Sequence, residues 1–418
     1  MKTVLVIGLG ISGKASALLL LSRGFSVIGA DRRWETLVDD PEVKQLIQKG
    51  LQVVSDEGML PVTPFSFCVV SPGIEPSHPL LKSVQKQNIE TIGEIELAFR
   101  YLPNRHILGV TGSNGKTTTV LLTAHILNTL GKKAKALGNV GAALSGYAVN
   151  PDPEEILVIE LSSFQMESLT LKPRFDTAAI LNITPNHLNR HASMQEYAAA
   201  KLRIKSCLKP NGKLFISKQV ARDFQIQGTI FEKKNAPAFD SEKIRLGCPE
   251  WENVEAAIAL CSLFEIRESK FFQAMKTFRK PPHRIEWVAE IGGVSYYNDS
   301  KASNVEAVMH AVRLFNGPLL LIAGGVDKGA SYRPWIDCFQ GKVKQIAVFG
   351  KAAEKMESEL ASFFSLMRVN TLQEALKKTR LLAKEGDTIL LSPGCSSYDQ
   401  FLNFEQRGEV FKKLVFER

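Results

Sequence analysis

Two glycine-rich segments constrain the fold of this chain more than any other feature. Each one follows a short apolar run and precedes a helical pattern: VIGLGISGKA at 6–15 and GVTGSNGKTTTV at 109–120. Glycines in such a strand-to-helix turn let the backbone approach phosphate oxygens, and the N-terminus of the helix favours their negative charge. The sequence therefore predicts two α/β units, each with a loop suited to a phosphorylated ligand.

The composition indicates a soluble globular protein with two to three domains. The chain has 418 residues, of which 44% are hydrophobic and 23% are charged. No apolar run approaches the roughly 18 residues of a membrane span. The start MKTVLVIGLG runs directly into a glycine turn without a small-residue cleavage site, so it is interpreted as a first strand and not as a signal peptide.

Charge and cysteine content narrow the expected partners and location. The formal net charge of +9 favours anionic partners, but no dense basic run with interleaved aromatic residues indicates nucleic acid. The 6 cysteines form no C-x-x-C pair, which fits reduced thiols in a cytoplasmic protein and no zinc site. We expect a cytoplasmic monomer without a membrane span.

The first loop has the pattern of a nucleotide-diphosphate site. Gly8, Gly10 and Gly13 match G-x-G-x-x-G between a strand and a helix, and Asp31 ends the next strand. A carboxylate at that position can bond a ribose hydroxyl. The motif does not distinguish NAD from another nucleotide, and a tight turn without a ligand is the alternative.

The second loop is a near match to the phosphate loop of nucleotide triphosphatases. Val110 occupies the position of the first glycine, but Gly112, Gly115, Lys116 and Thr117 keep the remaining pattern. Backbone amides of such a loop surround phosphate oxygens, the lysine meets the β- and γ-phosphates, and the hydroxyl reaches Mg²⁺.

Further candidates follow later strands of the same unit. Glu160 ends the apolar run ILVIE, at the sheet edge where ligands of open α/β sheets bind, which favours a metal ligand. His187 and His191 lie in NITPNHLNRH, just past another strand. Either a metal contact or a structural role is open for each of them. Lys201 lies in a helical pattern and is, from the pattern alone, a solvent-facing lysine.

Three α/β domains are predicted along the chain. Strand, helix and strand alternate from TVLVIG to FCVVSPGI, again from RHILGVTG to the Pro281–Pro282 break, and again from HRIEWV through DTILLSPG. The expected domains are residues 1–97 with a Rossmann-like parallel sheet, 98–282 with an α/β fold like that of P-loop ATPases, and 283–418 with a second Rossmann-like sheet.

Several motifs taken together resemble the Mur ligases, which are ATP-dependent amide-forming enzymes of peptidoglycan precursor synthesis. The segments GSNGKTTT, ELSSFQME, NITPNHLNRH and YAAAKLRI occur in that order and spacing. The segments PHRIEWV, YYNDSKASN and LSPGCSSYDQFLNFEQRG resemble the members that add D-glutamate to UDP-N-acetylmuramoyl-L-alanine. The resemblance covers essentially the whole chain, and it implies that one loop serves the UDP precursor and the other serves ATP.

The resemblance also implies a role for individual residues. ATP as co-substrate would contact Gly112, Ser113, Asn114, Gly115, Lys116, Thr117, Thr118, Asn253, His283, Arg284, Asp299 and Lys301. The UDP precursor would contact Ile11, Ser12, Asp31, Arg32, Ser71, Gly73 and Asn139, and D-glutamate would contact Ser303, Lys328, Ser397 and Phe404. Two Mg²⁺ ions would be held by Thr117, Glu160, His187 and Lys201, the lysine as a carbamate, and Lys116, Glu160, His187 and Lys201 would be catalytic.

The chain departs from the family pattern at a few of these positions. Asn186 and Asn189 stand where aspartates are usual, which puts the second metal site in doubt. Ser303 replaces a common threonine but keeps the hydroxyl. In the stretch that the family places near adenine, only Asn253 remains, so adenine contacts are a weaker expectation than phosphate contacts.

Three alternatives stay open at the level of sequence. One is another amide ligase of the same fold, such as a folate polyglutamate enzyme, although that activity needs no diphosphate loop at 8–13. A second is a nicotinamide-dependent oxidoreductase, which leaves the phosphate loop and Glu160 unexplained. A third is a nucleotide-binding protein without catalysis.

Overall fold

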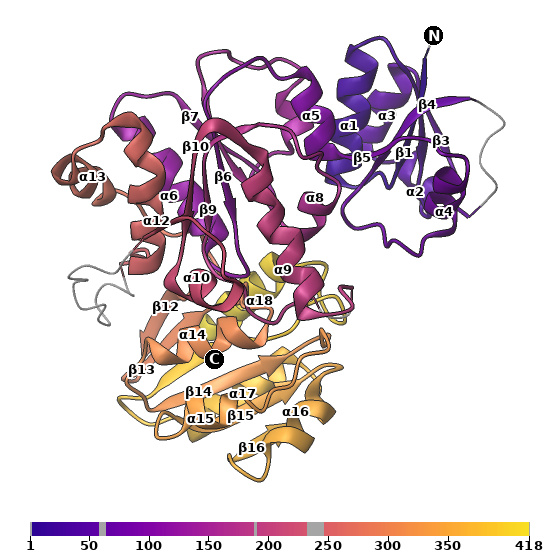
Figure 1. The fold of residues 1–418 in the computed structure, drawn as a ribbon. Helices are drawn as coiled ribbons and strands as arrows, with labels where there is room; N and C mark the ends of the chain where they lie inside the picture. The colour runs from indigo at the N-terminus through magenta and orange to yellow at the C-terminus, as the bar shows by residue number, and fades with distance from the viewer. Residues whose placement is uncertain (1, 58–63, 188–189, 232–245, 418) are drawn as a thin grey trace. The chain divides into compact units, whose positions relative to one another are not determined.

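The computed structural model describes residues 2–57, 64–187, 190–231 and 246–417. It divides into two compact units, of which the first comprises Met1–Asn182, Ala198–Glu232 and Glu255–Lys276, and the second comprises Ile183–Tyr197, Lys233–Val254 and Thr277–Arg418. The predicted α/β class is confirmed, because each of three sheets is accompanied by helices in the sequence between its strands (Figure 1).

The first sheet has the order β3-β2-β1-β4-β5, and every neighbouring pair is parallel. The order reverses between β1 and β4, and ligands of open parallel sheets bind beyond the carboxyl ends of the strands at such a reversal. Its strands are β1 (Thr3–Ile7), β2 (Ser26–Ala30), β3 (Leu51–Val54), β4 (Phe65–Val70) and β5 (Thr91–Gly93). Its helices are α1 (Ile11–Ser22), α2 (Trp34–Leu37), α3 (Pro41–Gln48), α4 (Pro79–Lys86) and α5 (Glu94–Tyr101).

The second sheet also belongs to the first unit and has the order β11-β10-β9-β6-β8-β7, with parallel neighbours throughout. Its strands are β6 (Ile107–Thr111), β7 (Ala134–Gly138), β8 (Ile156–Glu160), β9 (Phe175–Ile180), β10 (Leu208–Ile216) and β11 (Thr229–Ile230). The helices around them are α6 (Lys116–Thr129), α7 (Leu144–Tyr147), α8 (Ser163–Glu167), α9 (Met194–Leu202), α10 (Lys218–Phe224), α12 (Trp251–Cys261) and α13 (Glu268–Met275). The central strands β6 and β8 are buried at every position, and each is apolar except for its last residue, Thr111 or Glu160, at the carboxyl end.

The third sheet lies in the second unit, with the order β12-β13-β17-β14-β15-β16. Only β12 is antiparallel to its neighbour. Its strands are β12 (Glu286–Ile291), β13 (Val294–Asn298), β14 (Leu319–Gly324), β15 (Val343–Phe349), β16 (Leu366–Arg368) and β17 (Thr388–Leu391). Its helices are α14 (Val305–Arg313), α15 (Trp335–Phe339), α16 (Ala353–Leu360), α17 (Leu372–Leu382) and α18 (Phe404–Phe416).

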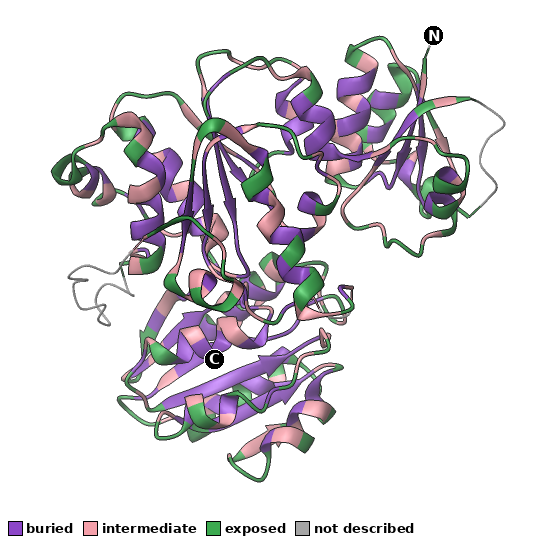
Figure 2. Cartoon of the chain, in the orientation of Figure 1, coloured by how far each residue is buried: buried purple, intermediate pink, exposed green. Residues whose placement is uncertain are grey.

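Alternate residues along the strands of the third sheet belong to two separate hydrophobic cores, one on each face of the sheet. Leu319 and Leu321 of β14 belong to one buried cluster, whereas Leu320 and Ile322 belong to the other. Successive side chains of a strand point to opposite faces, so a strand covered on both faces is apolar throughout. Figure 2 shows the inner strands β14 and β15 as almost continuously buried, whereas the edge strands β12 and β16 are mostly not. The carboxyl ends of the strands are thereby held in fixed positions.

Two sequence expectations concern the chain as a whole. No helix in the described ranges is long and apolar enough to cross a bilayer. All six cysteines are free thiols in the structure, as the absence of paired motifs predicts. The domain ranges 1–97, 98–282 and 283–418 stay predictions.

Candidate active site

The phosphate loop joins β6 to α6 in the middle of the second sheet. The strand ends at Thr111 and the helix begins at Lys116. Gly115 precedes the helix with φ 81°, a left-handed conformation that favours glycine over other residues. Ser113 and Asn114 lie in the loop, and Thr117 and Thr118 lie in the first turn of α6. The residues that the sequence assigned to phosphate binding are therefore in one short strand-to-helix turn.

Asn182, which the sequence analysis did not single out, fixes the shape of this loop. Its carbonyl oxygen accepts a hydrogen bond from Ser113 N at 2.8 Å, and its Oδ1 accepts one from Asn114 N at 2.8 Å. Its Nδ2 also donates to Asn114 O at 3.2 Å. Asn182 follows β9, the parallel neighbour of β6. That adjacency of two carboxyl-terminal strand ends is the signal that would have identified it.

Two lysines converge on one carbonyl group of the loop. Lys116 Nζ donates to Gly112 O at 2.8 Å and to Ser113 O at 2.9 Å, and Lys201 Nζ donates to the same Gly112 O at 2.8 Å. Lys201 is only 1% exposed, so the expectation of a solvent-facing lysine from the helical pattern is wrong. Burial, together with the nearby charge of Lys116 and against the attraction of Glu160, holds the pKa of Lys201 well below its usual range.

Glu160 ends β8 beside this loop. Asn139 Nδ2 donates to Glu160 Oε1 at 2.9 Å, and Asn139 N donates to Glu160 O at 3.0 Å. Glu160 Oε2 is buried and has no hydrogen-bond partner among the described residues. A buried carboxylate oxygen without a partner is costly unless a cation or a donor meets it.

This arrangement fits a magnesium ion. No group of three or more His, Cys, Asp or Glu side chains that could hold a metal occurs within the described ranges. Mg²⁺, however, is commonly held by one or two carboxylates together with waters and the phosphates of a nucleotide. The partnerless Glu160 Oε2, close to the phosphate loop, is the kind of ligand that such a site needs.

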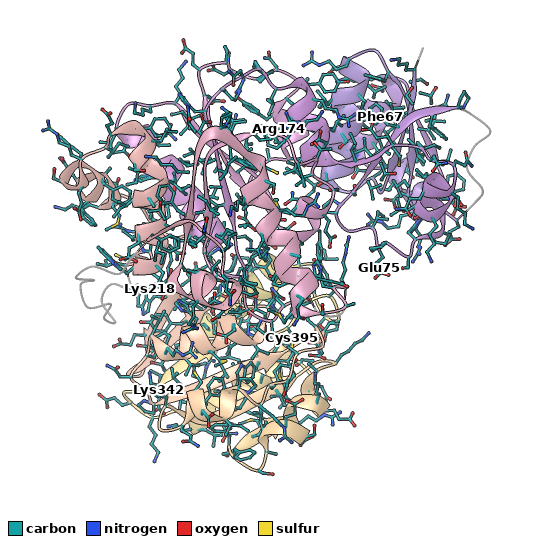
Figure 3. The ribbon with its side chains drawn as sticks, viewed as in Figure 1. Phe67, Glu75, Arg174, Lys218, Lys342 and Cys395 are labelled. Atoms are coloured by element: carbon teal, nitrogen blue, oxygen red, sulfur yellow. The ribbon has the colours of Figure 1, made fainter. Side chains whose placement is uncertain are left out.

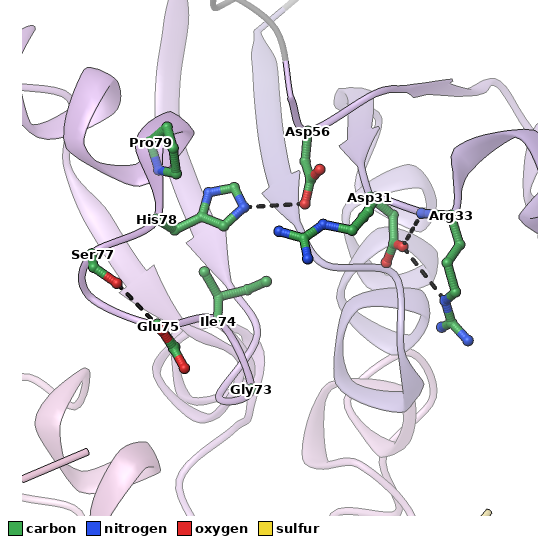
Figure 4. A pocket seen from close by; sticks show the side chains of 10 residues that line it. Asp31, Arg33, Asp56, Gly73, Ile74, Glu75, Ser77, His78 and Pro79 are labelled. Atoms are coloured by element: carbon green, nitrogen blue, oxygen red, sulfur yellow. Dashed lines mark hydrogen bonds and ion pairs between the residues drawn. The ribbon is translucent and has the colours of Figure 1, made fainter. Parts of the chain in front are cut away.

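A separate cavity of about 500 Å³ lies at the carboxyl ends of the first sheet. Figure 4 shows its lining side chains, with His78 bonded to Asp56 and Asp31 bonded to Arg33. The lining residues are Asp31, Arg32, Arg33, Asp56, Gly73, Ile74, Glu75, Ser77, His78 and Pro79. Three of them, Asp31, Arg32 and Gly73, are among the positions matched to the UDP precursor, whereas Asp56 and His78 were not identified from the sequence.

The first glycine loop lies beside this cavity at the start of α1. A Cβ atom on Gly13 would overlap the carbonyl oxygen of Gly8, so the tight turn requires glycine there. Ser71 Oγ donates to that same carbonyl at 2.7 Å. Ile11 is 77% exposed and, with Ser12, begins the helix. Asn139 is the exception among the matched positions, because its side chain bonds Glu160 of the second sheet.

In the second unit, residues matched to ATP surround the ring of Phe404. Lys301 Nζ lies 3.8 Å from the centre of that ring, and the ring of His283 meets it edge-on at 6.0 Å. Burial lowers the pKa of His283, and Asn298 Nδ2 lies 2.8 Å from its Nδ1. Arg284 follows His283 in a segment where His283 and Ile285 have positive φ angles of 66° and 53°.

Asp299 directly follows β13, and its side chain is buried. Ser392 Oγ donates to its Oδ2 at 2.8 Å, and Ile285 N donates to its Oδ1 at 3.2 Å. Burial raises the pKa of Asp299 to about 7 despite these donors. Close by in the sequence, Ser303 Oγ accepts a hydrogen bond from Lys328 Nζ at 3.0 Å, which brings together two of the positions matched to D-glutamate. Ser397, a third one, is buried.

Arg407, in the second unit, is another residue that the sequence analysis missed. It is 0% exposed and donates to Ser300 O at 2.7 Å, Ser300 Oγ at 3.0 Å, Cys395 O at 3.2 Å and Gly324 O at 3.5 Å. Burial lowers its pKa to about 10. The guanidinium therefore joins the last residue of β14 to the segments that follow β13 and β17, mainly through carbonyl oxygens. An arginine in the first turns of a helix gives no sequence signal of such burial.

The remaining candidates of the second unit have identifiable surroundings. His187 lies in a turn with φ 57°, and Asn186 Oδ1 is buried without a hydrogen-bond partner in the described part of the chain. His191 is buried with its ring against Tyr197 at 5.2 Å, which favours a structural role. Asn189 lies outside the described residues.

Asn253 is held by an ion pair. Its Nδ2 donates to Glu250 Oε2 at 3.0 Å, while Glu250 Oε1 accepts from Lys280 at 2.6 Å. Burial opposes the charge of Glu250, but Lys280 and His310 outweigh it and lower the pKa to about 2. The amide of Asn253 therefore has a fixed orientation.

These features define a phosphate-loop nucleotide-binding protein of the α/β class with an additional ligand cavity. Three family models match the sequence: the Mur ligase MurD-like N-terminal domain at residues 2–93, the Mur ligase middle domain at 110–241, and the Mur ligase glutamate ligase domain at 283–395. The chain belongs to the Mur ligase family.

Curated relatives support this membership over the full chain. A protein of Protochlamydia amoebophila named UDP-N-acetylmuramoylalanine--D-glutamate ligase is 43% identical, with 99% of this chain and 98% of the relative covered. A protein of Caldicellulosiruptor bescii with the same name is 38% identical, with 100% and 98% covered.

Solved structures support the fold. MurF ligase of Thermotoga maritima in complex with ADP gives a TM-score of 0.60 at 16% identity, covering 95% of this chain and 98% of that one. UDP-N-acetylmuramate-alanine ligase MurC of the same organism gives a TM-score of 0.57 at 17% identity, covering 99% of both chains.

Proposed function

We propose that this protein adds D-glutamate to UDP-N-acetylmuramoyl-L-alanine with consumption of ATP, in cytoplasmic peptidoglycan precursor synthesis. The observation that carries the proposal is the cluster of Lys116, Lys201 and Glu160 at the phosphate loop. The names of relatives that match the whole chain supply the substrates. The same relatives favour an acid–amino-acid ligase that forms ADP over an oxidoreductase.

The reaction divides into two transfers. The carboxylate of the L-alanine unit attacks the γ-phosphorus of ATP, which gives an acyl phosphate and ADP. The amine of D-glutamate, after losing a proton, attacks the acyl carbon and forms a tetrahedral intermediate. Collapse of that intermediate expels inorganic phosphate and leaves the amide. Lys116, the first residue of α6, with its Nζ on the loop carbonyl oxygens, stabilises the charge on the transferred phosphoryl group.

Magnesium is an expected cofactor, and we propose two ions held by Thr117, Glu160, His187 and Lys201. When bound, Mg²⁺ supplies charge neutralisation on the phosphoryl oxygens. Lys201 takes part as a carbamate: its lowered pKa favours the neutral amine, which adds to carbon dioxide with loss of a proton. The product is an anionic oxygen ligand. Asn186, beside His187 in the sequence, stands where the family usually has an aspartate, so His187 would hold its ion with less negative charge beside it.

The cavity of the first sheet is proposed to hold the UDP part of the precursor. The diphosphate would lie at the N-terminus of α1, because the first amides of a helix, here those of Ile11 and Ser12, have no partner within the helix. Ser71 holds the loop through its bond to Gly8 O. Asp31, Arg32 and Gly73 line the cavity itself. For Asn139, bonding to Glu160 favours a position between the metal ligand and the amino-acid end of the precursor.

The second unit is proposed to supply contacts to ATP and D-glutamate. Asn253, His283, Arg284, Asp299 and Lys301 contact the nucleotide. Ser303, Lys328, Ser397 and Phe404 bind D-glutamate, whose two carboxylates suit a lysine and hydroxyl groups. The domains proposed for the UDP precursor, for ATP, and for closure with D-glutamate are residues 1–97, 98–282 and 283–418. We propose a monomer as the working form.

The decisive experiment measures phosphate release from ATP with UDP-N-acetylmuramoyl-L-alanine and either D-glutamate, L-glutamate or no amino acid. We expect release only when the precursor and D-glutamate are both present, with the amide product identified by its mass. Release with a different amino acid would change the substrate and keep the reaction class. Folded protein that binds ATP but releases no phosphate in any combination would contradict the proposal.

The carbamate of Lys201 has a separate test. Protein equilibrated with ¹³C-bicarbonate is expected to show a carbamate signal by NMR that is absent from the Lys201→Met variant. A wild-type spectrum identical to that of the variant would remove the carbamate from the proposal without affecting the substrate assignment.

A further inference from the structure

Two loops that carry residues proposed for D-glutamate are joined by backbone hydrogen bonds. Lys328 lies in the loop after β14, and Ser397 lies in the loop after β17. Val326 N donates to Ser396 O at 2.8 Å, and Ser396 N donates to Val326 O at 3.1 Å. These bonds set the distance between the two loops but leave the direction of each side chain open.

A buried tyrosine hydroxyl adds a second connection between the same loops. Tyr332 is 1% exposed, and its ring packs 5.1 Å from that of Trp335 in the core. Its hydroxyl donates to Asp327 Oδ1 at 2.8 Å and lies 3.0 Å from Cys395 Sγ. Burial raises the pKa of the Cys395 thiol to about 12, so it is neutral and donates to the tyrosine oxygen. Cys395, labelled in Figure 3, is itself 0% exposed.

Asp327, which accepts the tyrosine hydrogen bond, directly precedes Lys328 in the chain. Besides the tyrosine, its Oδ2 accepts from Lys355 Nζ at 3.0 Å and from Gly329 N at 3.1 Å. Burial opposes the charge of Asp327, but the bonds to Tyr332 and Lys355 outweigh it and lower its pKa. The carboxylate thus fixes the turn at 327–329, from which Lys328 Nζ reaches Ser303 Oγ at 3.0 Å.

We propose that Tyr332 is a positioning residue for D-glutamate: its hydroxyl holds the Lys328 loop and the Ser397 loop in the relative position that the two carboxylates of the substrate require. The inference rests on the proposed function. Tyr332 does not itself contact substrate. A lysine and a hydroxyl group that grip opposite ends of a short dicarboxylate must keep a fixed separation, because a displacement of about 1 Å weakens such contacts strongly.

The test is Tyr332→Phe, which removes the hydroxyl and keeps the ring in the core. Loss of a hydrogen bond of this kind is expected to raise the KM for D-glutamate about 3- to 10-fold. The KM values for ATP and for the precursor, and kcat, are expected to stay within about twofold. Tyr296→Phe is the matched control, since Tyr296 is equally buried in the other core of the same sheet and is expected to change none of them.

Lys355→Met provides a second variant with less risk to folding, because Lys355 is half-buried and grips Asp327 from its other side. It is expected to raise the same KM by a smaller factor. An unchanged KM for D-glutamate in Tyr332→Phe, or an equal rise for all three substrates, would overturn the positioning role while the wild-type activity stands. Wild-type protein without D-glutamate-dependent phosphate release would overturn the proposed function itself, and this inference with it.

Discussion

The two glycine loops of the first unit share a Gly-Lys pair near the start of a helix, but their lysines have opposite surroundings. Lys14 is paired with the carboxylates of Asp40, at 3.5 Å, and Glu42. Lys116 donates instead to the carbonyl oxygens of Gly112 and Ser113. The ammonium group of Lys14 is thus held by side chains of a neighbouring helix, whereas that of Lys116 lies on the carbonyl groups of its own loop, where a phosphate of ATP is proposed to bind. The same sequence pattern therefore places its lysine in two different surroundings.

The largest difference is expected when each lysine is removed. Lys116→Ala loses the cation that stabilises the transferred phosphoryl group, so kcat/KM for phosphate release is expected to fall at least about a thousandfold. Lys14→Ala loses only a partly exposed ion pair and is expected to stay within about threefold of wild type. Comparable losses in the two variants would show that the contrast between the loops is wrong.

Two glycines of the first loop are expected to differ in how far substitution by alanine lowers the stability of the fold. Gly13→Ala places a methyl group on the carbonyl oxygen of Gly8, and we expect it to lower the free energy of unfolding by about 3 kcal/mol in urea titrations. At Gly10 an added Cβ meets nothing within 4 Å, so Gly10→Ala serves as the control. Equal stabilities of the two variants would mean that the loop relaxes more easily than its geometry indicates.

Asn182 distinguishes the second loop, because the first has no equivalent asparagine among the contacts described above. Asn182→Ala removes two side-chain hydrogen bonds to Asn114 and is expected to raise the KM for ATP about tenfold. Asn128→Ala also removes two bonds to backbone, both to Ala134, and is the matched control. A KM for ATP that rises equally in both variants would point to general destabilisation.

The smallest expected effect concerns stability and pH. The pKa of Lys201 is lower in the folded protein than in the unfolded chain, where a lysine titrates at about 10.4. As the pH falls below that value, the unfolded state binds more protons than the folded state, so the free energy of unfolding of the wild type decreases. Lys201→Met in buffer free of carbon dioxide should therefore be more stable than wild type at pH 7, with the gain shrinking toward pH 10.

For Lys14 we expect the opposite dependence of stability on pH. Burial disfavours its charge, but Glu42 and Asp40 outweigh that and raise its pKa, so the charged form stabilises the fold until pH rises through the folded-state pKa. Lys14→Met should be less stable than wild type at pH 7, and the loss should vanish at high pH. Urea titrations of both variants between pH 6 and 11 measure the two slopes. Slopes of the same sign would contradict the assignment.

Local patterns were sufficient to predict the apolar central strands such as β1, β6, β8 and β17, the two loops and the edge position of Glu160, whereas short strands such as β5, β11 and β16 were not predicted. Each of these predictions depends on residues close together in the sequence. Lys201 was misjudged because its burial depends on Gly112, which lies 89 positions earlier. Asn182 and Arg407 were missed for the same reason: they act on loops that become neighbours only through the order of strands in a sheet, and no local pattern specifies that order.

Arg407 has a consequence for how this site changes over evolutionary time. It donates to the end of β14 and to the segments after β13 and β17 mainly through carbonyl oxygens, and every amino acid supplies the same carbonyl. The bonds from Arg407 therefore do not depend on which side chains those segments carry. If Ser303, Lys328 and Ser397 bind the amino acid as proposed, substitutions there would alter the choice of amino-acid substrate while the backbone path stays the same. A lineage of ligases can diversify its substrates without rebuilding its scaffold.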